Sequence, residues 1–303
     1  MKVMFMGTPD IAVPCLEALI KHHEVVCVVT QPDKPKNRGH KLAMPPVKET
    51  ALTHGIDVLQ PLTFKDKAFM PELEKYNPDV IVVIAYGRIL PKYVLDFPRY
   101  GCINVHASLL PKYRGAAPIQ WCIVDGEKVT GITTMKMDVG LDTGDMLLKK
   151  EIEISDTMTG GELHDSMAKL CPEVLLETLE KIDTIVPEKQ DDSISCYASM
   201  IDKTMTVIDW NKTSDEIVNL VRGMNPFPAA RTTVDGRLLK IFTAGKCDMT
   251  GEAGVVLSVD DGIVVGCKDG SVRITELQPE GKRRMSAKDY LMGNKTEIGE
   301  KLV

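Results

Sequence analysis

Asn104 and His106 stand two residues apart in a strand-like run that breaks at a proline-bounded loop. Residues i and i+2 of an extended chain point to the same face, so we expect both side chains to project together from the carboxyl end of a strand. Open α/β sheets bind ligands at that edge. A carboxamide and a protonated imidazole can both donate hydrogen bonds to a developing oxyanion, each donor being worth roughly 2.7–4 kcal/mol. The pair therefore favours catalysis at a carbonyl group.

A loop rich in carboxylates and glycines follows a later strand and contains Asp138, Asp142 and Asp145. The spacing of these residues matches no standard calcium loop, and we predict no metal site. A carboxylate that orients His106 is the more economical use, and we assign that role to Asp142. Since no Ser or Cys nucleophile is well placed, the nucleophile is expected to come from the substrate. Acyl transfer to an amine fits these groups.

The turn Gly7-Thr8-Pro9-Asp10 follows the first predicted strand, where a dinucleotide-binding protein would cradle a pyrophosphate. The full G-x-G-x-x-G pattern is absent and Pro9 stands inside the turn. We therefore interpret this turn as a tight strand-to-helix connection rather than a nucleotide site.

Composition narrows the class of protein. The chain has 303 residues, 44% of them hydrophobic and 26% charged, which favours two globular domains. The net charge of -6 argues against a generally basic coat for nucleic acid, although a local basic patch stays open. The eight scattered cysteines indicate buried thiols in a reducing compartment. The first apolar run is too short for a signal peptide and no run approaches a membrane span, so we expect a cytoplasmic protein.

Alternating apolar and amphipathic segments in the first part of the chain predict a doubly wound, Rossmann-like α/β domain. Apolar runs without alternation are typical of parallel strands that are covered on both faces. The predicted strands lie at residues 2–6, 24–30, 57–59, 79–87, 104–106, 130–137 and 146–154. A helix is predicted over 65–76, and another reaches residue 182.

The later part of the chain has a different pattern. Residues 187–206 are acidic and non-periodic in part, and we interpret them as a linker between a domain at 1–186 and a domain at 207–303. A capped helix is predicted at 214–224. Short strands at 231–234, 238–243, 254–259, 262–267 and 271–277, with turns between them, predict a small β-barrel of the oligonucleotide-binding (OB) type.

Several segments resemble the methionyl-tRNA formyltransferase family, within the folate-dependent formyltransferase superfamily. They include Asn-Val-His-Ala-Ser-Leu-Leu-Pro from Asn104, Met-Asp-Val-Gly-Leu-Asp-Thr-Gly from Met137 and Asn-Pro-Phe-Pro from Asn225. Residues 6–10, 31–41, 208–210 and 277–287 extend the resemblance, in order, over essentially the whole chain. The Ser-Leu-Leu-Pro region alone is specific only to the superfamily.

The resemblance implies a reaction in which 10-formyltetrahydrofolate gives its formyl group to the α-amino group of methionine on initiator tRNA. The family's catalytic residues fall on Asn104, His106 and Asp142, and its tRNA-binding residues on Arg38, Lys41 and Lys203. Its folate pocket falls on Ser108, Leu109, Leu110, Pro111, Tyr86, Gly87, Arg88, Ile89 and Leu90. We expect a monomer that needs no metal and does not bind membranes, with further phosphate contacts from residues such as Lys282, Arg283 and Arg284.

Three alternatives stay open at this point. Glycinamide ribonucleotide formyltransferase shares the three catalytic residues but lacks a second domain. A formyltransferase that acts on UDP-4-amino-arabinose resembles both domains, although it has no evident use for the basic cluster at residues 34–41. A catalytically inactive tRNA-binding protein is the third alternative. The low content of aromatic residues, 5% of the chain, gives little for stacking on RNA bases.

Overall fold

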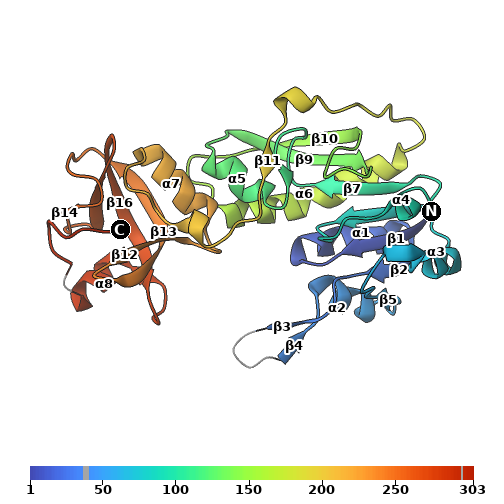
Figure 1. The fold of residues 1–303 in the computed structure, drawn as a ribbon, viewed down its shortest axis with the longest axis horizontal. Coiled ribbons are helices and arrows are strands. Elements are labelled where there is room, and N and C mark those ends of the chain that lie inside the picture. The colour runs from blue at the N-terminus through green and yellow to red at the C-terminus, as the bar shows by residue number, and fades with distance from the viewer. Residues whose placement is uncertain (37–40, 295) are drawn as a thin grey trace. The chain divides into compact units, whose positions relative to one another are not determined.

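The computed structural model describes residues 1–36, 41–294 and 296–303 (Figure 1). The chain forms two compact units. Unit 1 comprises Met1–Pro118, Thr130–Ile152 and His164–Ala198, and unit 2 comprises Ile119–Val129, Glu153–Leu163 and Ser199–Val303. Unit 2 thus takes in two early segments that the sequence analysis assigns to the first domain, while residues 187–198 of the predicted linker belong to unit 1.

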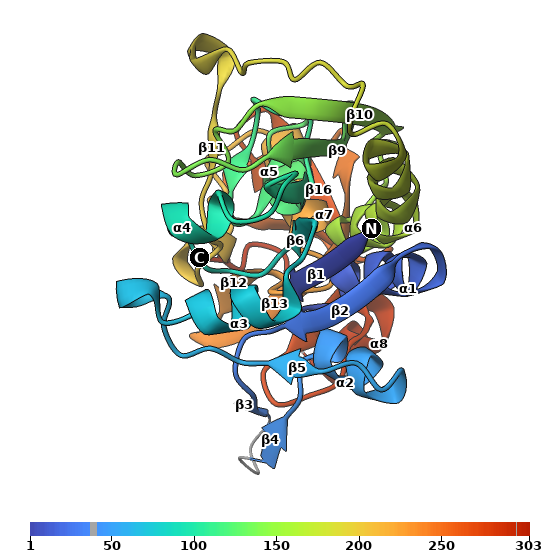
Figure 2. The same cartoon turned by 90° about the vertical axis from the view of Figure 1, so that its right-hand side faces the viewer.

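A seven-stranded sheet with the order β10-β9-β7-β6-β1-β2-β5 forms the centre of unit 1 (Figure 2). β1 pairs in parallel with β2 and β6, and β6 pairs in parallel with β7, whereas β7 and β9 are antiparallel. The strands are β1 (Lys2–Gly7), β2 (Glu24–Val29), β5 (Val58–Leu59), β6 (Val80–Ile84), β7 (Cys102–His106), β9 (Val129–Lys136) and β10 (Met146–Glu153). The chain runs outward from β1 through β2 to β5 and returns to β6, so the strand order reverses between β1 and β6.

The core of unit 1 comes from the apolar runs that predicted these strands. Met4, Met6, Ile81 and Val83 are buried together with Leu73 in one cluster. The helices that include unit 1 residues are α1 (Val13–His22), α2 (Pro46–Thr53), α3 (Met70–Tyr76), α4 (Lys92–Leu95), α5 (Pro118–Val124) and α6 (Gly160–Glu180). α5 and α6 also extend into unit 2.

The helix predicted over 65–76 is interrupted. A 3₁₀ turn occupies Lys65–Lys67, and α3 begins at Met70. Asp66 and Lys67 have φ angles of 52° and 58°, in the left-handed region that ends a right-handed helix. Pro71 at the start of α3 supplies no backbone N–H, which suits the first turn of a new helix.

Two short strand pairs lie outside the two main sheets. β3 (Lys34–Lys36) and β4 (Lys41–Ala43) form an antiparallel hairpin that projects from unit 1 in Figure 1. β8 (Arg114–Gly115) pairs in parallel with β11 (Tyr197–Ala198). The second pair joins the loop after β7 to residues near the end of unit 1.

Unit 2 is built on an antiparallel sheet with the order β12-β13-β16-β15-β14, and β17 pairs with β16. The strands are β12 (Ala230–Val234), β13 (Arg237–Cys247), β14 (Val256–Ser258), β15 (Ile263–Cys267), β16 (Gly270–Pro279) and β17 (Met285–Ser286). α7 (Ser214–Gly223) and α8 (Ala287–Gly293) complete the unit. Trp210, Ile241 and Ile274 lie in its core. The five strands predicted from sequence are confirmed.

The last residues of the chain contact both edges of this sheet. Leu302 forms a bridge with Val234 at the end of β12, and Lys301 forms a bridge with Val255 beside β14. Val303 and Thr233 also exchange backbone hydrogen bonds. Residues 299–303 therefore contact both edges of this antiparallel sheet.

Candidate active site

β7 places Asn104 and His106 on one face at its carboxyl end. Asn104 is paired with Val83 of β6 and with Met135 of β9, and His106 is paired with Thr133 of β9. Neighbours on both sides hold the strand, and the exposed fractions of Asn104 and His106 are only 8% and 6%. The two side chains are thus held on a rigid, buried strand.

The two ring nitrogens of His106 face protein oxygens. Nε2 lies 2.9 Å from the carbonyl oxygen of Tyr113, and since a carbonyl can only accept, Nε2 carries the hydrogen of this bond. Nδ1 lies 3.8 Å from Oδ2 of Asp142, which is too long for a hydrogen bond. His106 and Asp142 therefore lie close together in this structure without a direct hydrogen bond.

Asp142 is held by backbone contacts. Its Oδ2 accepts a hydrogen bond of 2.9 Å from the N–H of Gly115, and its φ is 53°, in the left-handed region. Asp138 organises the start of the same loop, because its Oδ1 accepts from the Gly140 N–H (3.0 Å) and the Thr143 hydroxyl (2.7 Å). No group of three His, Cys, Asp or Glu residues suited to a metal ion occurs within the described ranges.

The segment Ser108 to Pro111 is folded on itself. The Ser108 hydroxyl donates to the Lys112 carbonyl (2.6 Å), and the Thr133 hydroxyl donates to the Ser108 carbonyl (2.7 Å) while accepting from the Leu110 N–H (3.0 Å). Ser108, Leu110 and Pro111 are buried, and Leu109 is half-buried. The buried side chains shape this loop from inside, so Leu109 is the side chain of the four that is open to a ligand.

The turn after β6 contains Tyr86 and Gly87, next to the point where the strand order reverses. The Tyr86 carbonyl accepts hydrogen bonds from the Gln31 side chain (3.0 Å) and the Thr8 hydroxyl (3.4 Å). Gly87 has a φ of 77°, which a residue with a side chain would adopt with strain. Ligands of open α/β sheets bind at such reversal points. Because β6 and β7 are parallel neighbours, this turn and His106 lie at the same edge of the sheet.

Polar and apolar groups in this turn have contrasting environments. Burial raises the pKa of Tyr86 to about 12, and its hydroxyl has no hydrogen-bond partner in the part of the chain that the structure describes. Arg88 donates to the carbonyls of Pro61 and Leu62 at 3.0 and 2.9 Å. Leu90 is buried, but Ile89 is 76% exposed. The turn therefore presents an apolar side chain beside a fixed backbone.

The predicted tRNA-binding residues are less fully described. Arg38 lies outside the described residues, and of Lys41 only its place in β4 is described. The base of the β3–β4 hairpin is held where Lys48 donates to both oxygens of Asp33 (2.8 and 2.9 Å), a contact that lowers the pKa of the Asp33 carboxyl. In unit 2, Lys203 is exposed just before a 3₁₀ turn at Thr204–Thr206.

The basic run in unit 2 is only partly available for a ligand. Arg284 donates to both carboxylate oxygens of Glu276 at 2.6 and 2.5 Å, and its guanidinium lies 4.3 Å from the centre of the Phe242 ring. Lys282 and Arg283 are exposed. Of the three residues, these two are the better candidates for phosphate contacts.

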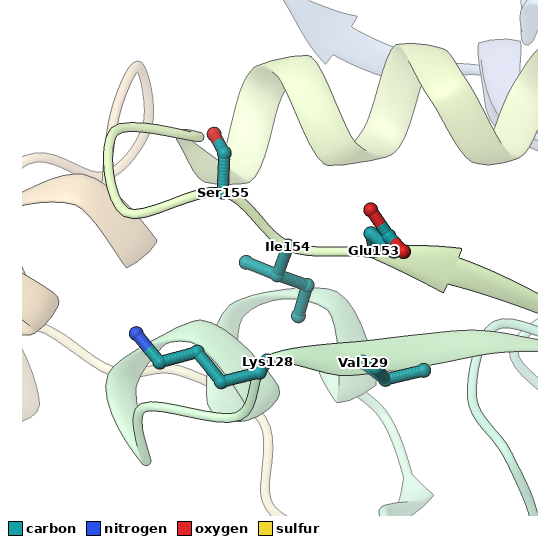
Figure 3. Close-up of a pocket in the computed structure, with 5 residues that line it drawn as sticks. All are labelled: Lys128, Val129, Glu153, Ile154 and Ser155. Carbon is teal, nitrogen blue, oxygen red and sulfur yellow. The ribbon is translucent and has the colours of Figure 1, made fainter.

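A surface cavity of about 440 Å³ lies beside the start of β9 and the end of β10 (Figure 3). Its lining residues are Lys128, Val129, Glu153, Ile154 and Ser155. None of the predicted site residues is among them. The cavity therefore does not add to the candidate site. At its rim, Lys128 is paired with Asp156 at 2.5 Å.

Sequence reasoning missed Gln190, which donates to the backbone of the Asp142 loop. Its Nε2 lies 2.8 Å from the carbonyl oxygens of both Asp142 and Gly144. A single glutamine in a non-periodic segment has no local signal that would reveal this contact.

Comparison with known proteins identifies the family. Residues 1–179 match the family model described as formyl transferase, and residues 200–295 match that of the formyl transferase C-terminal domain. The chain is 54% identical over 310 residues to the methionyl-tRNA formyltransferase of Ruminiclostridium cellulolyticum, a match that covers 100% of this chain and 99% of that protein. This chain belongs to the methionyl-tRNA formyltransferase family.

Solved structures agree on the fold. The methionyl-tRNA formyltransferase from Clostridium thermocellum is 18% identical with a TM-score of 0.57, over 82% of this chain and 94% of that one. An N-formyltransferase from Helicobacter canadensis, in complex with folinic acid and dTDP-3-aminofucose, is 21% identical with a TM-score of 0.69, over 92% and 99%. The predicted Rossmann-like domain followed by an antiparallel β domain is confirmed. No described helix is both long enough and apolar enough to span a membrane.

Proposed function

We propose that the chain transfers the formyl group of 10-formyltetrahydrofolate to the α-amino group of methionine on initiator tRNA. The observation that carries the proposal is the match at 54% identity over the whole chain to a protein named for this activity. The gathering of Asn104, His106 and Asp142 in unit 1 supports it, because these groups suit direct acyl transfer to an amine.

Asn104 supplies the first oxyanion donor. No hydrogen bond or ion pair engages its side chain among the residues that the structure describes, and its polar atoms are not among the fully buried ones that lack a partner. The carboxamide of this mostly buried residue is therefore held on a rigid strand with its polar atoms open to a ligand oxygen. Its N–H groups donate to the formyl oxygen as negative charge develops there.

His106 supplies the second donor, in its protonated form, with Asp142 balancing its charge. In this structure Nε2 of His106 donates its hydrogen to the Tyr113 carbonyl. To donate to the formyl oxygen from Nε2, His106 must exchange this bond for one to the substrate. Catalytic hydrogen bonds are often long without substrate and shorten in the complex, which fits the 3.8 Å between His106 and Asp142.

The folate co-substrate, which supplies the formyl carbon, is proposed to bind between Ser108 to Pro111 and Tyr86 to Leu90. The half-buried Leu109 and the exposed Ile89 offer apolar contacts, and Gly87 lets a ligand approach the backbone closely. The buried residues of both segments keep this edge in shape. Arg38, Lys41 and Lys203 are proposed to contact tRNA phosphates.

A formyltransferase that acts on a sugar nucleotide is the second candidate. The Helicobacter canadensis protein, whose complex contains dTDP-3-aminofucose, shares the fold over most of the chain. A binding protein without activity is the third candidate.

One assay separates the three candidates. Purified protein is given 10-formyltetrahydrofolate with either initiator Met-tRNA or UDP-4-amino-arabinose as the acceptor, and His106→Ala serves as the control for contaminating enzymes. We expect formylation of Met-tRNA only. Transfer to the amino sugar alone would overturn the proposal, and binding of Met-tRNA without transfer would favour the inactive protein.

A further inference from the structure

Residues 188–198, here called the crossing segment, contact both loops that flank His106. Glu188 and Met146, just after the Asp142 loop, exchange backbone hydrogen bonds of 2.8 Å. At its other end, β11 pairs with β8, and the Cys196 carbonyl accepts from the Arg114 N–H at 3.0 Å. The crossing segment therefore belongs to the framework of unit 1.

Gln190 lies near the start of the crossing segment and uses every group of its carboxamide. Nε2 donates to the carbonyls of Asp142 and Gly144, at 2.8 Å each, and Oε1 accepts from Nε of Arg114 at 2.9 Å. Arg114 also donates from Nη2 to Oδ1 of Asp192 at 2.8 Å. Gln190 thus ties the Asp142 loop to the residue that precedes Gly115.

These contacts close a ring around the carboxylate of Asp142. Gly115 donates to Oδ2 of Asp142, Arg114 is the preceding residue, and Gln190 joins Arg114 to the Asp142 carbonyl. The left-handed φ of Asp142 costs of order 1–3 kcal/mol and persists only when the surroundings over-determine it. The ring supplies that constraint and fixes the carboxylate relative to His106.

We propose that Gln190 is a positioning residue for formyl transfer, which acts by holding Asp142 in place to face His106. The proposal rests on the proposed function, in which Asn104, His106 and Asp142 are the catalytic residues. Gln190 acts through Asp142 and does not touch the substrate.

Two substitutions separate positioning from simple stabilisation. Gln190→Ala removes all three hydrogen bonds. Gln190→Glu keeps an acceptor for Arg114, and even strengthens that contact, but it loses both donations and sets a carboxylate against two carbonyl oxygens. A role limited to securing Arg114 would therefore leave Gln190→Glu fully active.

The test measures kcat and KM for Met-tRNA and 10-formyltetrahydrofolate in the full chain. We expect both variants to lower kcat on the order of 10- to 100-fold, because a displacement of about 1 Å at a catalytic group has an effect of this size. Both KM values should stay close to those of the wild type. Lys189→Ala, at the exposed neighbouring position, is the matched control and should leave kcat unchanged.

The same substitutions in an Asp142→Ala background show whether Gln190 acts through Asp142. We expect Gln190→Ala to change kcat there by less than about twofold, since its effect is already lost with the carboxylate. The role of Gln190 would be overturned by a wild-type kcat in Gln190→Glu, or by an effect of Gln190→Ala that is equally large in the Asp142→Ala background. Either result would leave the proposed function standing. Wild-type kcat in Asp142→Ala itself would instead refute the catalytic assignment.

Discussion

The N–H of Gly115 donates a hydrogen bond of 2.9 Å to Oδ2 of Asp142, so the carboxylate that faces His106 is attached to the chain that leaves β7. This bond therefore joins the chain that follows β7, the strand of Asn104 and His106, directly to the loop that contributes Asp142.

Replacement of His106 by Ala should lower the rate of formylation by two orders of magnitude or more, because one oxyanion donor contributes about 10²–10³. The rate is measured with saturating Met-tRNA and 10-formyltetrahydrofolate, and circular dichroism checks that the fold is kept. His22→Ala, at the exposed end of α1, is the control and should behave as the wild type. Near wild-type turnover in His106→Ala would remove His106 from the mechanism.

Asn104→Asp keeps the size of the side chain but removes both N–H donors. It also places a negative charge where negative charge develops in the reaction, so single-turnover formylation should slow by at least about 10²-fold. Asn104→Ala removes the donors without adding charge and should slow the reaction less than Asn104→Asp. Equal rates in Asn104→Asp and the wild type would contradict the donor role of Asn104.

Arg38→Ala should impair formylation of initiator tRNA while the affinity for 10-formyltetrahydrofolate changes little. The reason is that the basic segment at 34–41 is assigned to tRNA and the folate is assigned to the other two segments. Steady-state kinetics with each substrate varied in turn measure both effects. Lys21→Ala removes one exposed positive charge from α1 and serves as the control. An equal loss for both substrates would mean that the segment has a structural role only.

Binding of tRNA should weaken as salt rises, since contacts between lysine or arginine and phosphate release counterions. The dissociation constant is measured over a salt series for the wild type and for Lys203→Ala. Loss of one phosphate contact should reduce the slope of log affinity against log salt by about one. An unchanged slope would exclude Lys203 from the phosphate contacts, and a flat response in the wild type would exclude such contacts altogether.

Acid should weaken α7 through Glu216. The hydrogen bond from the Thr213 backbone N–H, then that from its hydroxyl and the contact with Lys212, lower the pKa of Glu216 from 4.5 to about 2. A carboxyl with a lowered pKa stabilises the fold above its ordinary pKa, and this stability is lost as the pH falls through the folded value.

Glu216→Ala should therefore lower the unfolding temperature near neutral pH, and the difference from the wild type should shrink as the pH falls from 4.5 towards 2. Thermal unfolding followed by circular dichroism measures this. Glu17→Ala, an exposed carboxylate on α1, should show no such trend. A difference that is constant with pH would mean that the charge of Glu216 is irrelevant.

The pattern of apolar residues predicted the strands of both units. A strand that is buried on two faces has a continuous apolar run, and a strand that is buried on one face alternates apolar and polar residues. The same pattern placed Asn104 and His106 at the end of β7. It failed over residues 65–76, where Asp66 and Lys67 adopt left-handed conformations. Neither residue type signals that conformation as glycine would, so periodicity alone continued the helix.

Polar contacts between distant segments left no such mark. Gln190 is 48 residues from Asp142, and its non-periodic surroundings looked like a connector. The distance of 3.8 Å between His106 and Asp142 could not be predicted from the sequence either, since it depends on which oxygen of the carboxylate the Gly115 N–H engages. Residue type and order could suggest the three partners, but the bonds that hold them required coordinates.

Residues 299–303 bridge to β12 and lie beside β14. An uncovered sheet edge offers a row of unsatisfied N–H and C=O groups to which a second chain can add. By bonding to both borders at once, this short segment leaves fewer backbone groups of unit 2 free to pair with an added strand.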